Sequence, residues 1–126
     1  GPCRNIHGHS YYLYVTVIGE PVDDPGNSCN GMVMDFNLLK KIIAEAITNQ
    51  LDHALVLNAN CTVKELQLEK HFDNVVYLPY QPTCENMLTD FSQRISQLLP
   101  AGVVLHNLRL CETVTSSAEW FAGDQE

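Results

Sequence analysis

Two histidines near the start of the chain have the spacing of a metal site. His7 and His9 flank Gly8 directly before a segment rich in aromatic and β-branched residues, which predicts a strand. Side chains two positions apart on a strand point to the same face, so the two imidazoles could bind one ion. Zinc suits imidazole ligands, but a catalytic zinc needs three protein ligands, so one more would have to come from elsewhere. The alternative interpretation is two polar residues at a strand end.

Cys3, Asp52 and His53 are candidates for proton transfer. Cys3 lies four positions before His7, and a thiol beside a cation can act as a base or nucleophile. Asp52 directly precedes His53, and a carboxylate can orient an imidazole for acid–base catalysis. Taken singly, these residues also fit a terminal cysteine and a solvated helix end.

Glu112 is an acidic residue near the end of an apolar strand expected over Val103 to Thr113. A carboxylate there could accept two hydrogen bonds from the guanidine-like edge of a heterocycle. The alternative is a strand-end side chain turned to solvent. The alternation of side chains favours a pocket, because Glu112 shares a partly apolar face with Val104, His106, Leu108 and Leu110.

These candidate residues must be positioned by strands and helices that the pattern predicts. A strand over Ser10 to Gly19 comes first, and the loop Glu20 to Gly31 follows, rich in Pro, Gly, Asp and Asn. Met32 to Phe36 is expected to be a short second strand that completes a long-loop hairpin.

Two long amphipathic helices are expected after this hairpin. The first follows a cap at Asp35 or Asn37 and should end near Asn49. The second begins at the Thr83 cap, with Glu85 in its first turn. Its apolar stripe comprises Met87, Leu88, Phe91, Ile95, Leu98 and Leu99.

Between and after the helices, the pattern predicts a capping box over Thr62 to Glu65, an extended segment over Asn74 to Leu78, and the final strand at Val103. Strands before and after the helices indicate an α+β class with a largely antiparallel sheet.

Length and charge limit the possible functions. The chain has 126 residues, which fits a single domain over residues 1–126. Its formal net charge of -8 argues against nucleic-acid binding, and no apolar run is long enough to cross a membrane. The five cysteines are odd in number and contain no C-x-x-C pair, which indicates a reducing, cytoplasmic location with mostly free thiols.

Five motifs together resemble the 6-pyruvoyl-tetrahydropterin synthase family, which includes the 6-carboxytetrahydropterin synthases of the queuosine pathway. The motifs occur in the family's order and span nearly the whole chain. They are Cys3 with His7-Gly8-His9-Ser10-Tyr11, Gly31-Met32-Val33-Met34-Asp35-Phe36, Leu51-Asp52-His53 with Leu57-Asn58, Pro82-Thr83-Cys84-Glu85-Asn86, and Cys111-Glu112-Thr113.

The resemblance implies a role for each site residue in a lyase that acts on 7,8-dihydroneopterin triphosphate. His7 and His9 match two of the family's three zinc ligands, and the third is a histidine on an upstream strand for which this sequence has no match. The first strand of the fold is therefore expected to be missing from this chain. Cys3 matches the catalytic cysteine. Asp52 and His53 match the pair that relays protons with it, and Glu112 matches the pterin anchor.

The resemblance also implies the tunnelling fold (T-fold), an antiparallel sheet with two helices on one face. Such subunits form trimers or hexamers with active sites between subunits. The three residues between Cys3 and His7 are similar to the queuosine-pathway branch, which favours a 6-carboxytetrahydropterin product. The alternatives are a 6-pyruvoyl-tetrahydropterin synthase, a pterin-binding T-fold protein without activity, and a generic metal-binding module.

Overall fold

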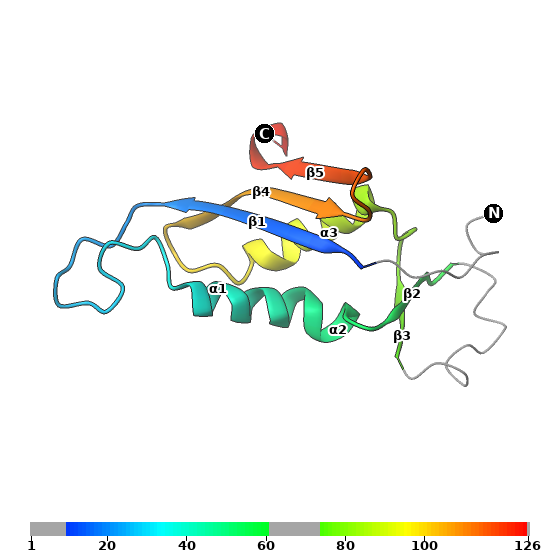
Figure 1. Ribbon diagram of the computed structural model, residues 1–126, viewed down its shortest axis with the longest axis horizontal. Coiled ribbons are helices and arrows are strands. Elements are labelled where there is room, and N and C mark those ends of the chain that lie inside the picture. The colour runs from blue at the N-terminus through cyan, green and yellow to red at the C-terminus, as the bar shows by residue number, and fades with distance from the viewer. Residues whose placement is uncertain (1–9, 61–73, 126) are drawn as a thin grey trace.

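The computed structural model describes residues 10–60 and 74–125 of the chain. Within them, the main sheet has the strand order β1-β4-β5 and is antiparallel throughout. Its strands are β1 (Tyr12–Gly19), β4 (Val103–Cys111) and β5 (Ser117–Phe121). A smaller parallel sheet pairs β2 (Leu55–Asn58) with β3 (Val75–Leu78). Figure 1 shows the long helices together on one face of the main sheet.

The first helical run begins at the predicted cap. The side chain of Asp35 accepts a hydrogen bond from the backbone N–H of Asn37 at 2.8 Å, and α1 (Phe36–Ile43) follows. The run then widens into a π-helical turn over Ala44–Thr48 and ends as α2 (Asn49–Leu51). It therefore ends close to the expected position.

The second long helix, α3 (Cys84–Ser96), also begins where the sequence predicts. The hydroxyl of Thr83 accepts a hydrogen bond from the backbone N–H of Asn86 at 3.2 Å. A short 3-10 helix over Ala122–Gln125 follows β5. In the described part of the chain, no helix is both long and apolar enough to span a bilayer.

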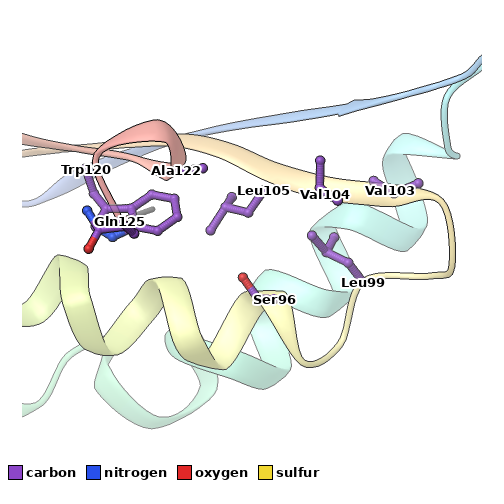
Figure 2. Close-up of a pocket in the computed structure, with 8 residues that line it drawn as sticks. All are labelled: Ser96, Leu99, Val103, Val104, Leu105, Trp120, Ala122 and Gln125. Carbon is purple, nitrogen blue, oxygen red and sulfur yellow. The ribbon is translucent and has the colours of Figure 1, made fainter.

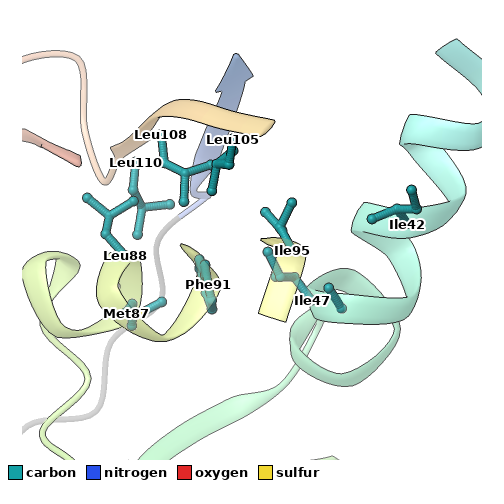
Figure 3. Packing of buried hydrophobic residues seen from close by; sticks show 10 residues of the cluster. Ile42, Ile47, Met87, Leu88, Phe91, Ile95, Leu105, Leu108 and Leu110 are labelled. Atoms are coloured by element: carbon teal, nitrogen blue, oxygen red, sulfur yellow. The ribbon is translucent and has the colours of Figure 1, made fainter. Parts of the chain in front are cut away.

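The hydrophobic core lies between the two helices and the main sheet (Figure 3). The stripe predicted for α3 is buried over most of its length, although Leu98 is 42% exposed because α3 ends at Ser96. The buried cluster comprises Ile42, Ala46, Ile47, Met87, Leu88, Phe91, Ile95, Leu105, Leu108 and Leu110. The predicted α+β class, with two helices on one face of an antiparallel sheet, is confirmed.

A bulge changes which β4 residues face the core. The pairing of β1 with β4 shifts register between Thr16 and Val17, so His106 has no partner on β1. Leu105 on one side of the bulge and Leu108 on the other are therefore both buried. The sequence predicted that Glu112 shares one face of this strand with four residues. That prediction is right for Leu108 and Leu110, which are buried, and wrong for Val104 and His106, which are exposed.

Several predicted elements differ from the structure. Residues 32–35 form no strand, because α1 starts at Phe36 and the loop closes through backbone hydrogen bonds from Val22 to Met32 and from Gly31 to Val22. Two strands, β2 and β5, were not predicted from the sequence. Because β5 follows β4, the strand at Val103 is not the last one. The predicted capping box at Thr62 lies outside the described residues.

Candidate active site

Glu112 lies just beyond the end of β4, where the chain turns toward β5. Its backbone N–H donates to the carbonyl of Ser116 at 2.9 Å, and the N–H of Thr113 donates to the same carbonyl at 3.2 Å. This tight turn fixes the backbone from which the carboxylate extends. Because Glu112 continues the alternation of Leu108 and Leu110, its half-buried side chain lies on the helix-covered side of the sheet.

Cys84, the first residue of α3, is a direct partner of Glu112. Its Sγ donates to the Oε2 of Glu112 across 3.9 Å, which is within range for a sulfur donor. The Thr83 cap fixes the start of α3 and therefore the position of this thiol. The sequence assigned Cys84 no role beyond its place in the motif at the start of α3, and the structure shows its contact with Glu112.

The surroundings of Glu112 keep neighbouring donors protonated. Burial, followed by the charge of Glu112, raises the pKa of the Cys84 thiol. Burial and then the same carboxylate raise the pKa of the Tyr11 hydroxyl, just before β1. Glu112 is thus a carboxylate beside neutral groups, and it can accept hydrogen bonds from a ligand that carries N–H groups.

Asp52 and His53 form a pair at the end of the first helical run. Asp52 leaves the helix in an extended conformation, and His53 has a φ of 57°, in the left-handed region. For a residue other than glycine this conformation costs about 1 kcal/mol, and such strain is concentrated at functional sites. The Nε2 of His53 lies 3.7 Å from the Oδ2 of Asp52, and their side chains are 93% and 67% exposed.

The two sets of residues share one end of the molecule. Figure 1 shows the end of α2, the start of β1 and the turn between β4 and β5 at the same end of the main sheet. The structure thus brings Glu112 together with Cys84, and Asp52 together with His53, at that end.

Cys3, His7 and His9 lie outside the described residues. In the described ranges, no three His, Cys, Asp or Glu side chains cluster in a way that could hold a metal ion. The predicted zinc site therefore depends on the two imidazoles of His7 and His9, whose donor chemistry fits zinc. The predicted roles of these three residues remain predictions.

A shallow pocket elsewhere on the molecule has different chemistry. It has a volume of about 280 Å³ and lies between the end of α3, the start of β4 and the 3-10 helix (Figure 2). No ionisable side chain lines it. The lining residues are Ser96, Leu99, Val103, Val104, Leu105, Trp120, Ala122 and Gln125. This composition lacks the acid–base groups of a catalytic site, in contrast to the Glu112 end of the sheet.

The fold and the site define a small α+β protein with a half-buried carboxylate just beyond the end of a sheet strand. The chain belongs to the 6-pyruvoyl tetrahydropterin synthase family, whose model matches residues 1–122. The predicted family membership is therefore confirmed.

Curated relatives carry two different names within this family. The chain is 31% identical over 114 residues to the 6-carboxy-5,6,7,8-tetrahydropterin synthase of Rickettsia felis, an alignment that covers 88% of this chain and 79% of that protein. It is 37% identical over 116 residues to the 6-pyruvoyl tetrahydrobiopterin synthase of Pongo abelii, covering 90% of this chain and 66% of that protein. Both names describe tetrahydropterin synthases, which are lyases, so the prediction of a lyase is confirmed.

Solved structures confirm the predicted T-fold. An uncharacterised protein from Wolinella succinogenes superposes with a TM-score of 0.74 at 18% identity, over 95% of this chain and 81% of that one. The 6-pyruvoyl tetrahydropterin synthase of Plasmodium vivax superposes with a TM-score of 0.65 at 17% identity, over 93% of this chain and 81% of that one. At these identities the likeness concerns the fold alone.

Proposed function

We propose that this chain is a zinc-dependent lyase that converts 7,8-dihydroneopterin triphosphate to 6-carboxy-5,6,7,8-tetrahydropterin, in the synthesis of queuosine and related 7-deazapurines. The observation that carries the proposal is the carboxylate of Glu112 beside protonated Cys84 and Tyr11 at one end of the sheet. A pterin ring presents adjacent N–H groups that such a carboxylate can bind, and charge-assisted hydrogen bonds of this kind are strong.

The metal would be held by His7 and His9 together with a further ligand. Bound zinc supplies Lewis-acid chemistry that acidifies the side-chain hydroxyl groups of the substrate. The thiol of Cys3 then takes or returns a proton at the side chain of the pterin. His53 carries out the complementary proton transfer, with Asp52 beside it. The 3.7 Å between their side chains and the exposure of the imidazole to an incoming ligand support this role.

The spacing between Cys3 and His7 and the relatives named 6-carboxytetrahydropterin synthases favour the 6-carboxy product. A 6-pyruvoyl-tetrahydropterin synthase is the second candidate, because the relative from Pongo abelii has the higher sequence identity, 37%. The two reactions differ in the carbon atoms retained, since a carboxy substituent keeps one side-chain carbon and a pyruvoyl substituent keeps three.

Assembly into a trimer or hexamer is part of the proposal. The face of the main sheet that the helices leave open carries large exposed apolar side chains, which favours burial between subunits. These are Tyr12, Tyr14, Ile18, Val104 and Phe121.

Free thiols at Cys29, Cys84 and Cys111 agree with a reducing, cytoplasmic location.

Turnover of dihydroneopterin triphosphate by variants tests the proposal against a pterin-binding protein without activity. Cys3→Ala and His53→Ala should each lower turnover by about 10²–10⁴-fold and leave pterin binding nearly intact, because they remove proton transfer and no binding contact. Cys29→Ala and His106→Ala are the matched controls, since Cys29 lies in a loop and His106 is exposed on β4. Wild-type turnover in both site variants would contradict the roles of Cys3 and His53, whereas pterin binding without any turnover by the wild-type chain would favour the non-catalytic alternative.

A further inference from the structure

The helical run that leads to Asp52 contains a turn of unusual geometry. Between α1 and α2, Ala44–Thr48 is π-helical. Such turns contain one extra residue and occur frequently at functional sites. Since an α-helix rotates by roughly 100° per residue, one extra residue changes the direction of everything that follows by about that angle. The π-helical turn therefore decides where Asp52 and His53 project.

Arg94 of α3 holds this turn from outside. Its Nη1 donates to the carbonyl oxygen of Ala46, inside the π-helical turn, at 3.1 Å. The same nitrogen donates to the Oε1 of Gln50 in α2 at 2.8 Å. One guanidinium group thus bridges the π-helical turn and the last turn before Asp52. Figure 3 shows the apolar part of the same contact, where Ile47 lies beside Ile95.

Arg94 is itself held in place by Asp90, one turn earlier in α3. Its Nε donates to the Oδ1 of Asp90 at 2.9 Å, and its Nη2 lies 2.8 Å from the Oδ2 of Asp90. Tyr80, between β3 and α3, donates its hydroxyl hydrogen to the same carboxylate. The side chains of Arg94 and Asp90 are only 24% and 20% exposed, so this bidentate pair is shielded from solvent.

The Asp52–His53 pair has little of its own to hold it. Both side chains are largely exposed, and His53 occupies a strained backbone conformation. The backbone N–H of Asp52 donates to Thr48, the last residue of the π-helical turn, at 2.9 Å. The position of the pair therefore follows from the position of that turn.

We infer that Arg94, fixed by Asp90 and Tyr80, is a positioning residue that sets the Asp52–His53 pair by bridging Ala46 and Gln50. This inference rests on the proposed function, in which the pair transfers protons. No hydrogen bond or ion pair joins Arg94 to either residue of the pair, so it acts through the helical turns that it bridges at Ala46 and Gln50.

The test compares Arg94→Met, which keeps the apolar stem but removes the hydrogen bonds, with Lys40→Met, which removes a cation from an exposed site on α1. Arg94→Met should lower kcat for dihydroneopterin triphosphate by roughly ten- to hundredfold, because small displacements of catalytic groups are that costly. KM and zinc content should stay within about twofold of wild type, since neither the pterin anchor nor the metal ligands are touched. Gln50→Ala, at an exposed position, should show a smaller loss of kcat and keeps the test valid if Arg94→Met does not fold.

A double-variant cycle separates positioning from general destabilisation. In a His53→Ala background, Arg94→Met should cost no further turnover, because there is no imidazole left to position. An equal loss with and without His53, or wild-type kcat in both Arg94→Met and Gln50→Ala, would overturn the inference.

Amide hydrogen exchange gives a readout that does not depend on activity. Exchange at Asp52 should accelerate by about tenfold in Arg94→Met and stay unchanged in Lys40→Met. Unchanged exchange in Arg94→Met would contradict the inference even if turnover falls. A wild-type chain without turnover would contradict the proposed function instead, and exchange would still decide whether Arg94 holds the pair.

Discussion

The thiol of Cys84 donates to the carboxylate of Glu112 across 3.9 Å, joining the first residue of α3 to the end of β4. The two residues are 28 positions apart in the chain. They meet because the Thr83 cap fixes the start of α3 beside the turn that Ser116 closes after β4. This contact leaves a carboxylate beside a neutral donor, where an N–H-bearing ligand can bind.

Replacing Glu112 by Gln should weaken pterin binding at least about tenfold. The substitution keeps the shape but removes the charge, and a hydrogen bond to a charged group contributes about 1.5–3 kcal/mol. Binding can be measured by titration with a pterin analogue. Glu119→Gln, an exposed acid on β5, is the matched control and should bind as wild type. Equal affinity in both variants would remove the anchoring role from Glu112.

The Cys84 thiol should react slowly with iodoacetamide near neutral pH. Burial and the charge of Glu112 raise its pKa, so little reactive thiolate is present, and the rate should rise only as the pH approaches that pKa. Glu112→Gln removes one cause of the raised pKa and should accelerate the labelling of Cys84. Peptide mapping with Cys29 as the internal reference measures this, and an unchanged rate at Cys84 in the variant would contradict the contact.

Stability should fall at alkaline pH in a way that depends on Tyr80. Burial, then the hydrogen bond to Asp90, raises the pKa of this hydroxyl above its usual value of 10.0. The folded state therefore keeps a proton that the unfolded state loses, so this contribution is complete below pH 10.0 and is lost as the pH rises toward the folded pKa.

Urea unfolding at several pH values measures this effect. Tyr80→Phe should be less stable than wild type at neutral pH, and the difference should shrink above pH 10.0. Tyr12→Phe is the control, because Tyr12 is 64% exposed on β1. A difference between wild type and Tyr80→Phe that stays constant with pH would contradict the assignment.

Zinc binding should depend on His7 and His9. A protein that carries the third ligand as well as His7 and His9 should bind about one zinc ion per subunit. Changing both histidines to Ala should abolish zinc binding. Metal analysis after dialysis measures this, with His106→Ala as the control at an exposed position. Stoichiometric zinc in the double variant would contradict the ligand assignment.

The capped helices and the main strands could be predicted from the sequence because their signals are local. Asp35 and Thr83 each accept the hydrogen bond expected of a cap, and β1 alternates between exposed and half-buried residues as its composition predicts. The position of Glu112 at the end of a core strand was predicted in the same way.

The features that the sequence did not reveal depend on partners far along the chain. The π-helical turn is held by Arg94, which lies 48 positions after Ala46. The bulge at His106 shifts the face of Val104, and β2 is stabilised by parallel pairing with β3. Cys84 gave no signal beyond its place in a helix-start motif, since its importance comes from its distance to Glu112.

The most direct test of the proposed function is the mass of the product formed from 7,8-dihydroneopterin triphosphate by the zinc-loaded protein. We expect a pterin that keeps one side-chain carbon as a carboxylate, with the release of a two-carbon fragment, and we expect this product to disappear in Cys3→Ala. A product that keeps all three side-chain carbons would identify a 6-pyruvoyl-tetrahydropterin synthase instead. Unchanged substrate under conditions where Glu112-dependent binding is measured would contradict a catalytic role altogether.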